Sequence, residues 1–157
     1  MTFGSKKWLC AALILLGGIG VAATVLTVAA PRKYRAPSRH AGDAELLARV
    51  IRAEGEAEPY TGQVAIGAVI LNRIQNPKFP KSLAGVIFEP RAFESVSNGA
   101  VNRSPTPSCR KAARAAIGGW DPSGGALYFY NPGKIKGRSW IWTRRVIQRI
   151  GKHVFAL

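Results

Sequence analysis

The sequence predicts an α+β domain that is mainly α-helical, with a small β element, preceded by an N-terminal hydrophobic helix. Apolar residues recur at helical spacing between residues 43 and 56, and the stretch 61–74 is apolar almost all round. Short segments with strand character follow residue 126. A chain of 157 residues fits one such domain and a short appendage.

The N-terminal segment is uncharged from Trp8 to Ala30 and follows two lysines. That length is enough to cross a bilayer core. Two interpretations of residues 1–30 are open, a cleaved signal peptide and an uncleaved membrane anchor. Four basic residues follow the apolar run and two precede it. Basic residues next to a membrane anchor tend to stay in the cytoplasm, so for an anchor this distribution counts against export of the C-terminal part. Residues 31–41 form a basic, proline-containing linker, and residues 42–157 form the catalytic-domain candidate.

The helices are predicted from periodicity and from the residues that end them. Asp43 is the expected N-cap of a helix that runs to about Glu56. The helix over 61–74 is expected to be central and buried, and Asn76-Pro77 ends it. Further predictions are a short helix at 82–88, a loop or turn at 93–102 and a helix with a basic face at 108–117.

Three segments have strand character, namely 126–130, 140–143 and 153–155. Trp140 and Trp142 alternate with Ile141, so a strand would place both tryptophans on one face. Sugar rings bind aromatic faces because their C–H surfaces are apolar. The same aromatic residues also suit a hydrophobic core, and the pattern leaves both uses open.

The charge is +15, and the part of the chain after the apolar run carries +13. Such a field attracts nucleic acid, anionic lipid or peptidoglycan carboxylates. The basic residues form no recognisable DNA- or RNA-reading motif, so we expect no nucleic-acid partner. With two cysteines and two histidines, the sequence supports no metal cluster, and Cys109 is expected to be a small buried residue.

Glu54 continues the apolar stripe of the first helix, one turn beyond Val50. A carboxyl group held against an apolar face is harder to ionise, as a general acid near neutral pH must be. Glycosidic cleavage requires such an acid. The alternative, that Glu54 only marks where this helix face meets solvent, is equally compatible with the spacing. Glu56 falls on the charged face and is expected to pair with Arg52.

The segment from Glu54 to Arg73 (EGEAEPYTGQVAIGAVILNR) resembles the opening signature of the SleB-like cell-wall hydrolases, the family of the spore-cortex-lytic enzymes. The similarity continues through 93–96 and 98–99, resumes at 121–132 and ends with 151–155. It covers nearly all of residues 44–157, and several separated motifs in the right order make it specific.

The resemblance implies a lysozyme-like fold related to lytic transglycosylases. It also implies cleavage of peptidoglycan between N-acetylmuramic acid and N-acetylglucosamine, without a metal or organic cofactor. The family's catalytic glutamate falls on Glu54. Four further positions are expected to bind substrate: Tyr60, Gln63, Tyr130 and Asn131. Gly55 and Glu56 stand where the family usually has alanine and a basic residue, so we expect weaker activity than in typical members.

The expected reaction is a lytic transglycosylation with Glu54 as acid and base. A hydrolysing muramidase would need a second carboxylate, for which Glu58 is the first candidate and Glu94 and Asp121 are the others. A peptidoglycan-binding module without activity is the remaining alternative. We expect the protein in the cell envelope, secreted or membrane-anchored, with peptidoglycan glycan strands as partner. An uncleaved N-terminal segment would add the membrane as a second partner.

Overall fold

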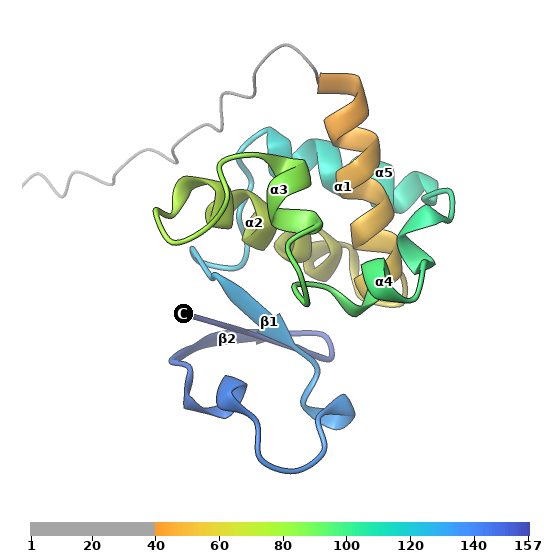
Figure 1. Ribbon diagram of the computed structural model, residues 1–157. Helices are drawn as coiled ribbons and strands as arrows, with labels where there is room; N and C mark the ends of the chain where they lie inside the picture. Colours follow the sequence, from red (N-terminus) through yellow and green to blue (C-terminus); the bar gives the residue numbers. More distant parts are fainter. Residues whose placement is uncertain (1–39) are drawn as a thin grey trace, which may run out of the picture.

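The computed structural model describes residues 40–157, which form a helical lobe and a smaller lobe built around a three-stranded sheet (Figure 1). The predicted signal peptide or anchor and nearly all of the linker lie outside these residues. Within residues 40–157, no helix has the length and apolar character needed to cross a membrane.

Two long helices begin the helical lobe, α1 (His40–Gly55) and α2 (Tyr60–Gln75). Asp43 lies in the first turn of α1, so its prediction as the N-cap was wrong by about one turn. Burial of α2 on almost every side confirms its predicted central place. A Cβ on Gly67 of α2 would lie 3.0 Å from Ile51 Cδ1 and 3.2 Å from Ala116 Cβ, so glycine lets α2 lie close to its neighbours.

The other helices are short except for α5 (Pro107–Ile117), which packs against both α1 and α2. Thr106 caps α5 by accepting a hydrogen bond from the backbone N–H of Cys109, at 3.2 Å. Cys109 is buried, as predicted. Between α2 and α5 the chain forms α3 (Leu83–Ile87), α4 (Glu94–Ser97) and the 3₁₀ turn η1 (Ala100–Asn102). The prediction of a loop over 93–102 therefore missed two single turns of helix.

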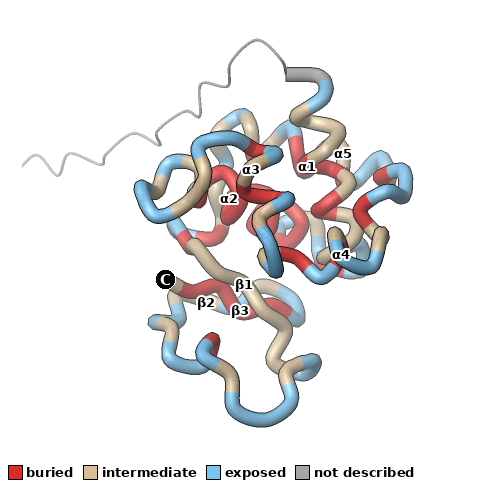
Figure 2. The backbone as a smooth tube through the Cα atoms, viewed as in Figure 1, coloured by how far each residue is buried: buried red, intermediate tan, exposed pale blue. Residues whose placement is uncertain are grey.

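The small lobe contains β1 (Tyr128–Tyr130), β2 (Val146–Ile150) and β3 (His153–Ala156), with 3₁₀ turns η2 (Pro132–Lys134) and η3 (Trp140–Thr143) between β1 and β2. β3 is the central strand and pairs antiparallel with both neighbours. It is buried along its whole length, whereas the core otherwise lies among the helices (Figure 2).

The prediction of a strand at 140–143 was wrong, because these residues form η3. Ser139 caps this turn, and only Ile141 is buried, while Trp140 and Trp142 are 59% and 45% exposed. A turn with one inward residue gives the same apolar pattern as a short strand. The strand β2 was not predicted, since an irregularity between Val146 and Gln148 breaks its period of two.

Arg73 connects the two lobes from the side of α2. Its Nε donates a hydrogen bond to the backbone oxygen of Leu127, at 2.7 Å. The guanidinium carbon lies 5.3 Å from the ring centres of Phe79 and Phe93 and 5.6 Å from that of Tyr128. Burial lowers the pKa of Arg73, and Tyr128 and Glu89 partly offset that effect.

Candidate active site

A cleft opens where the end of α1 faces the small lobe. It consists of two adjoining hollows of about 300 and about 320 Å³. The hollows share six lining residues: Ala53, Glu54, Ala100, Asn131, Lys134 and His153. Because both hollows include Glu54, an elongated ligand could pass this carboxyl group on either side.

Glu54 stands in the last turn of α1, where the apolar stripe of that helix reaches the cleft. Val50 and Ile51 below it are fully buried. Its Oε1 atom is also buried and has no hydrogen-bond partner among the described residues. A buried polar atom without a partner is unusual, and in a cleft it suits a group that exchanges a proton with a ligand.

Glu58 is buried at the base of the cleft and joins the two lobes. Its Oε2 accepts a hydrogen bond from the backbone N–H of Lys152, at 2.9 Å. Its Oε1 lies 3.3 Å from Nδ1 of His153. Gly151 has φ +59°, and a Cβ there would overlap Glu58 Oε2 and lie 2.8 Å from Pro59 Cδ. The turn between β2 and β3 therefore fits closely over this carboxylate.

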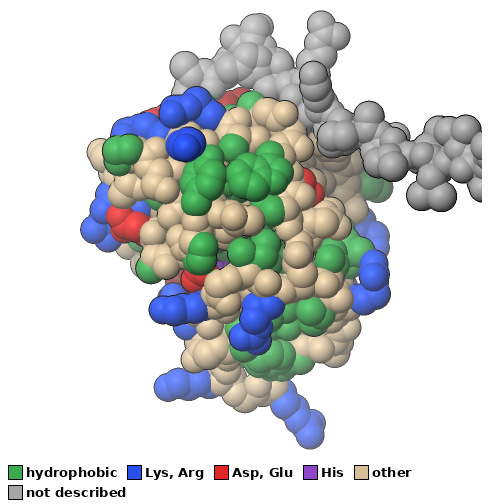
Figure 3. Space-filling model, turned by 180° about the vertical axis from the view of Figure 1, so that it is seen from behind, with side chains coloured by type: hydrophobic (Ala, Val, Ile, Leu, Met, Phe, Trp, Pro, Cys, Tyr) green, Lys and Arg blue, Asp and Glu red, His purple; other side chains and the backbone are tan. Residues whose placement is uncertain are grey.

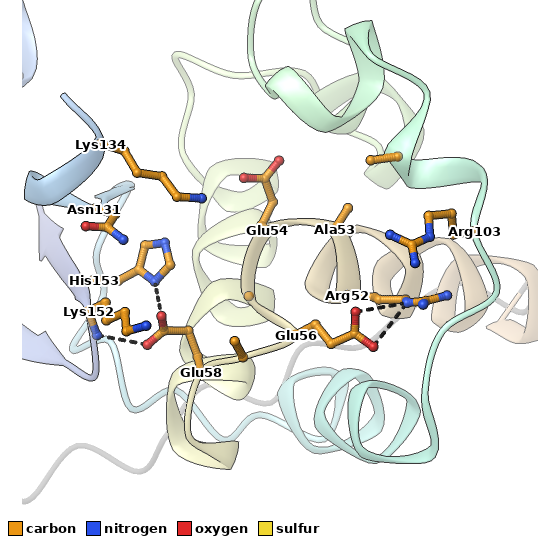
Figure 4. Close-up of a pocket in the computed structure, with 13 residues that line it drawn as sticks. Arg52, Ala53, Glu54, Glu56, Glu58, Arg103, Asn131, Lys134, Lys152 and His153 are labelled. Carbon is orange, nitrogen blue, oxygen red and sulfur yellow. Dashed lines mark hydrogen bonds and ion pairs between the residues drawn. The ribbon is translucent and has the colours of Figure 1, made fainter. Parts of the chain in front are cut away.

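His153 lies between Glu58 and the open cleft (Figure 4). Burial lowers its pKa, and Glu58 and Glu54 partly offset that effect, while Lys134 adds to it. Burial therefore favours the neutral ring. A neutral imidazole whose Nδ1 faces a carboxylate carries its proton there and leaves Nε2 as an acceptor.

Lysine and arginine side chains flank Glu54. Lys134 of η2 extends its ammonium group toward the Glu54 carboxyl (Figure 4), and Lys152 and Arg103 also line the cleft. Arg52 is engaged elsewhere, since its Nε lies 3.3 Å from Glu56 and its Nη1 donates to the backbone oxygen of Ser104. The Arg52–Glu56 pair was predicted from the sequence and is confirmed.

The structure brings together four of the predicted site residues, because Glu54, Glu58, Tyr130 and Asn131 all line the cleft. Of the other two carboxylate candidates, Glu94 lines the hollow that contains Tyr130. Asp121 does not line this cleft. Its Oδ1 accepts from the backbone and hydroxyl of Ser123, and its Oδ2 accepts from Gly125 N–H and Asn72 Nδ2.

Two predicted substrate-binding residues lie outside the lining of the cleft. Tyr60 packs against Trp120, with ring centres 5.8 Å apart, and beneath the ammonium group of Lys111. Gln63 is buried, and its amide donates to the backbone oxygens of Glu56 and Glu58 and accepts from the Ser108 hydroxyl. In this position Gln63 holds the turn between Glu54 and Glu58. A substrate-binding role for these two residues stays a prediction.

Sequence reasoning did not select His153, Lys134, Lys152 or Ala100 for the site. His153 stands 99 positions after Glu54, and no spacing rule connects them. The available signal was that His153 is the one histidine of the predicted catalytic domain. Among residues 40–157, no group of three or more His, Cys, Asp or Glu residues is arranged to hold a metal ion.

Comparisons with known proteins show the family to which the chain belongs. The family model described as Cell Wall Hydrolase matches residues 57–156. The spore cortex-lytic enzyme of Bacillus cereus is 50% identical over 113 residues, which cover 72% of this chain and 43% of that protein. The chain therefore spans less than half the length of this relative. The cell wall hydrolase CwlJ of Bacillus subtilis is 30% identical over 120 residues, covering 72% of this chain and 83% of that protein.

Solved structures agree in fold. The catalytic domain of the Bacillus cereus SleB protein matches with a TM-score of 0.70 and 47% identity, over 77% of this chain and 94% of that one. The catalytic domain of the germination-specific lytic transglycosylase SleB of Bacillus anthracis matches with a TM-score of 0.72 and 46% identity. This match covers 78% of this chain and 100% of that one. The fold of this chain is thus the one shared by these two SleB catalytic domains. More particularly, the chain belongs to the Cell Wall Hydrolase family.

Proposed function

We propose that the protein cleaves peptidoglycan glycan strands between N-acetylmuramic acid and N-acetylglucosamine, as a lytic transglycosylase with Glu54 as general acid and base. The observation that carries the proposal is the Glu54 side chain, whose buried Oε1 lacks a partner and which both hollows share. The helical lobe with a small sheet and the likeness to a lytic transglycosylase domain support a lysozyme-like relationship.

In the first step, protonated Glu54 donates its proton to the glycosidic oxygen as the bond to the anomeric carbon breaks. The sugar develops oxocarbenium-like charge, which the Glu54 carboxylate left behind stabilises. In the second step, the 6-hydroxyl of the muramic acid attacks the anomeric carbon and returns its proton to Glu54. The product is a 1,6-anhydro sugar, and the enzyme regains its starting state without water.

His153 supports this reaction as a positioning residue. Glu58 faces Nδ1 at 3.3 Å, and Figure 4 shows the opposite edge of the ring turned toward Lys134 and Glu54. We infer that Nε2 accepts a hydrogen bond from a sugar hydroxyl and orients the ring for attack. Since Glu58 is committed to Lys152 and His153, it is poorly placed to act as an independent nucleophile or base.

A hydrolysing muramidase is the second candidate, because Glu94 lines the cleft together with Glu54. An inverting hydrolase needs a second carboxylate about 6.5–9.5 Å from the acid, with a water molecule between them. Glu94 is exposed and makes no ion pair within the described part of the chain, so it is free to activate water.

Mass spectrometry of fragments from purified peptidoglycan tests both candidates. We expect 1,6-anhydromuramic ends from the native protein and a loss of about 10²–10⁴-fold in release rate with Glu54→Gln. Glu94→Gln is the matched control and should retain the rate. Reducing ends that disappear with Glu94→Gln would establish hydrolysis instead, and equal release by native protein and Glu54→Gln would remove Glu54 from its role.

We further propose that the enzyme acts in the cell envelope, where its substrate lies. Whether residues 1–30 are removed or retained decides between a secreted and an anchored form. Mass measurement of the protein recovered from its native host distinguishes these forms.

A further inference from the structure

Charge is unequally divided between the two lobes. Residues 40–121 carry ten Lys and Arg against eight Asp and Glu, a side-chain charge of +2. Residues 122–157, here called the small lobe, carry no Asp or Glu and a charge of +7. Figure 3 shows basic side chains on the lower part of the molecule, which is the sheet side of Figure 1, as well as on the helical part above it, where acidic side chains also appear. The small lobe is therefore strongly cationic, and two of its seven cations, Lys134 and Lys152, line the cleft.

Three cations of the cleft are available to a ligand. Lys134 and Lys152 come from the small lobe, and Arg103 follows η1 on the other side. All three are exposed, and none forms an ion pair with any residue in the 40–157 range. Like charges around one cleft repel each other, and the binding of anionic groups would relieve that repulsion.

The carboxylates of the cleft do not neutralise these cations. Glu56 pairs with Arg52, and Glu58 is buried against Lys152 N–H and His153. Glu54 forms no ion pair among residues 40–157. Glu94 lines only the hollow that contains Tyr130, whereas Lys152 and Arg103 line the other hollow.

Aromatic rings continue the cleft along the small lobe and indicate which anion it binds. Tyr130 lines the cleft, and the exposed ring of Trp142 meets it edge-on, with ring centres 5.4 Å apart. Beside them, Trp140 meets Tyr128 at 5.5 Å, and Arg144 lies over both of these rings. Exposed rings next to cations suit a carbohydrate that carries charge. Because this surface is continuous with the cleft, we favour the substrate strand over a lipid surface as its occupant.

We propose that the small lobe binds free carboxylate groups on the muramyl side chains of the substrate, through Lys134 and Lys152, so that the enzyme prefers anionic glycan strands. The carboxylates can belong to the lactyl group or to the attached peptide. This inference rests on the proposed function and adds a preference to it. Strands whose carboxyl groups are blocked as amides should bind weakly.

The test measures binding separately from cleavage. The full chain carrying Glu54→Gln is titrated with soluble glycan strands that keep their carboxylates and with the same strands after carbodiimide amidation. We expect the free-carboxylate strands to bind about 10-fold more tightly, with the difference shrinking as salt is added. Lys134→Gln/Lys152→Gln in the Glu54→Gln background should abolish the difference.

The matched control is Lys78→Gln/Arg114→Gln, which removes the same charge from exposed residues outside the cleft. It should preserve the difference between the two strands. Equal binding of free and amidated strands overturns the proposal, and so does an equal loss in both double variants. A third outcome is that Lys134→Gln/Lys152→Gln binds phosphatidylglycerol vesicles more weakly but binds glycan strands as before. This outcome would make the small lobe a lipid-binding surface and overturn the proposal.

Failure of the proposed function gives a different result. If the native protein releases no fragments, but binding depends on the carboxylates and on Lys134 and Lys152, the proposed carboxylate recognition is supported. The catalytic role of Glu54 is then refuted. If the native protein releases fragments but binds free and amidated strands equally well, only the proposed recognition of carboxylates is refuted.

Discussion

Replacement of Gly151 by alanine should weaken the contact between the two lobes at Glu58. Gly151 has φ +59°, a left-handed conformation that costs an alanine about 1–2 kcal/mol. The added Cβ would also displace the Glu58 carboxylate, which then loses its hydrogen bond from Lys152 N–H. A hydrogen bond to a charged group contributes about 1.5–3 kcal/mol. We therefore expect Gly151→Ala to lower the free energy of unfolding by about 2.5–5 kcal/mol.

Gly125 provides the matched control for this substitution. Its φ is +82°, so alanine meets the same backbone strain, but a Cβ there has no atom within 4 Å. Gly125→Ala should therefore cost only the strain, about 1–2 kcal/mol. The difference between the two variants isolates the contact between Glu58 and the turn that joins β2 and β3.

Urea unfolding followed by tryptophan fluorescence measures both free energies. The cleavage rate of the folded protein gives a second readout, because a displaced Glu58 no longer holds His153. We expect Gly151→Ala to cleave slowly even where it is folded and Gly125→Ala to cleave at the native rate. Equal destabilisation by both substitutions, with equal rates, would refute the role given to Glu58.

Three other predictions concern buried or half-buried side chains. Burial lowers the pKa of His153, so as the pH falls the unfolded chain binds a proton at this residue before the folded chain does. The free energy of unfolding should therefore decrease as the pH drops below about 6.5. Thermal unfolding between pH 8 and pH 5 measures this decrease, which should be smaller in His153→Gln. Arg73→Lys should lower stability by about 2–4 kcal/mol, because lysine loses the planar contact with Phe79, Phe93 and Tyr128; denaturant titration measures this, and no change would show that a simple charge suffices. Asp121→Asn should lower the melting temperature but not the cleavage rate per folded molecule, whereas a loss of rate at full folding would return Asp121 to the catalytic candidates.

The helical half of the molecule was largely readable from the sequence, because its signals are local. Val50 and Ile51 define a stripe that leads to Glu54, and the absence of a polar face on α2 predicts its burial. The end of α2 at Gln75 likewise follows from Asn76-Pro77. In each case, the information lies within the helix itself or in the residues next to its end.

The sheet side was less readable, because its contacts are distant in sequence. The Glu58–His153 contact spans 95 positions, and no periodicity predicts it. The alternation of Trp140, Ile141 and Trp142 has the period of a strand, but Ser139 turns the chain into a 3₁₀ helix there. Tyr60 and Gln63 lie close to Glu54 in sequence, yet α2 carries them away from the cleft lining.

The order of the strands has a consequence for synthesis of the enzyme. β1 and β2 do not pair with each other; each pairs with β3, which is made after both. The helical lobe, with Glu54 in place, can therefore fold on an emerging chain while the facing wall of the cleft is still missing. His153 arrives only with β3 itself. A chain that stalls before this strand would contain Glu54 but would lack the strand that brings His153 to the facing wall of the cleft.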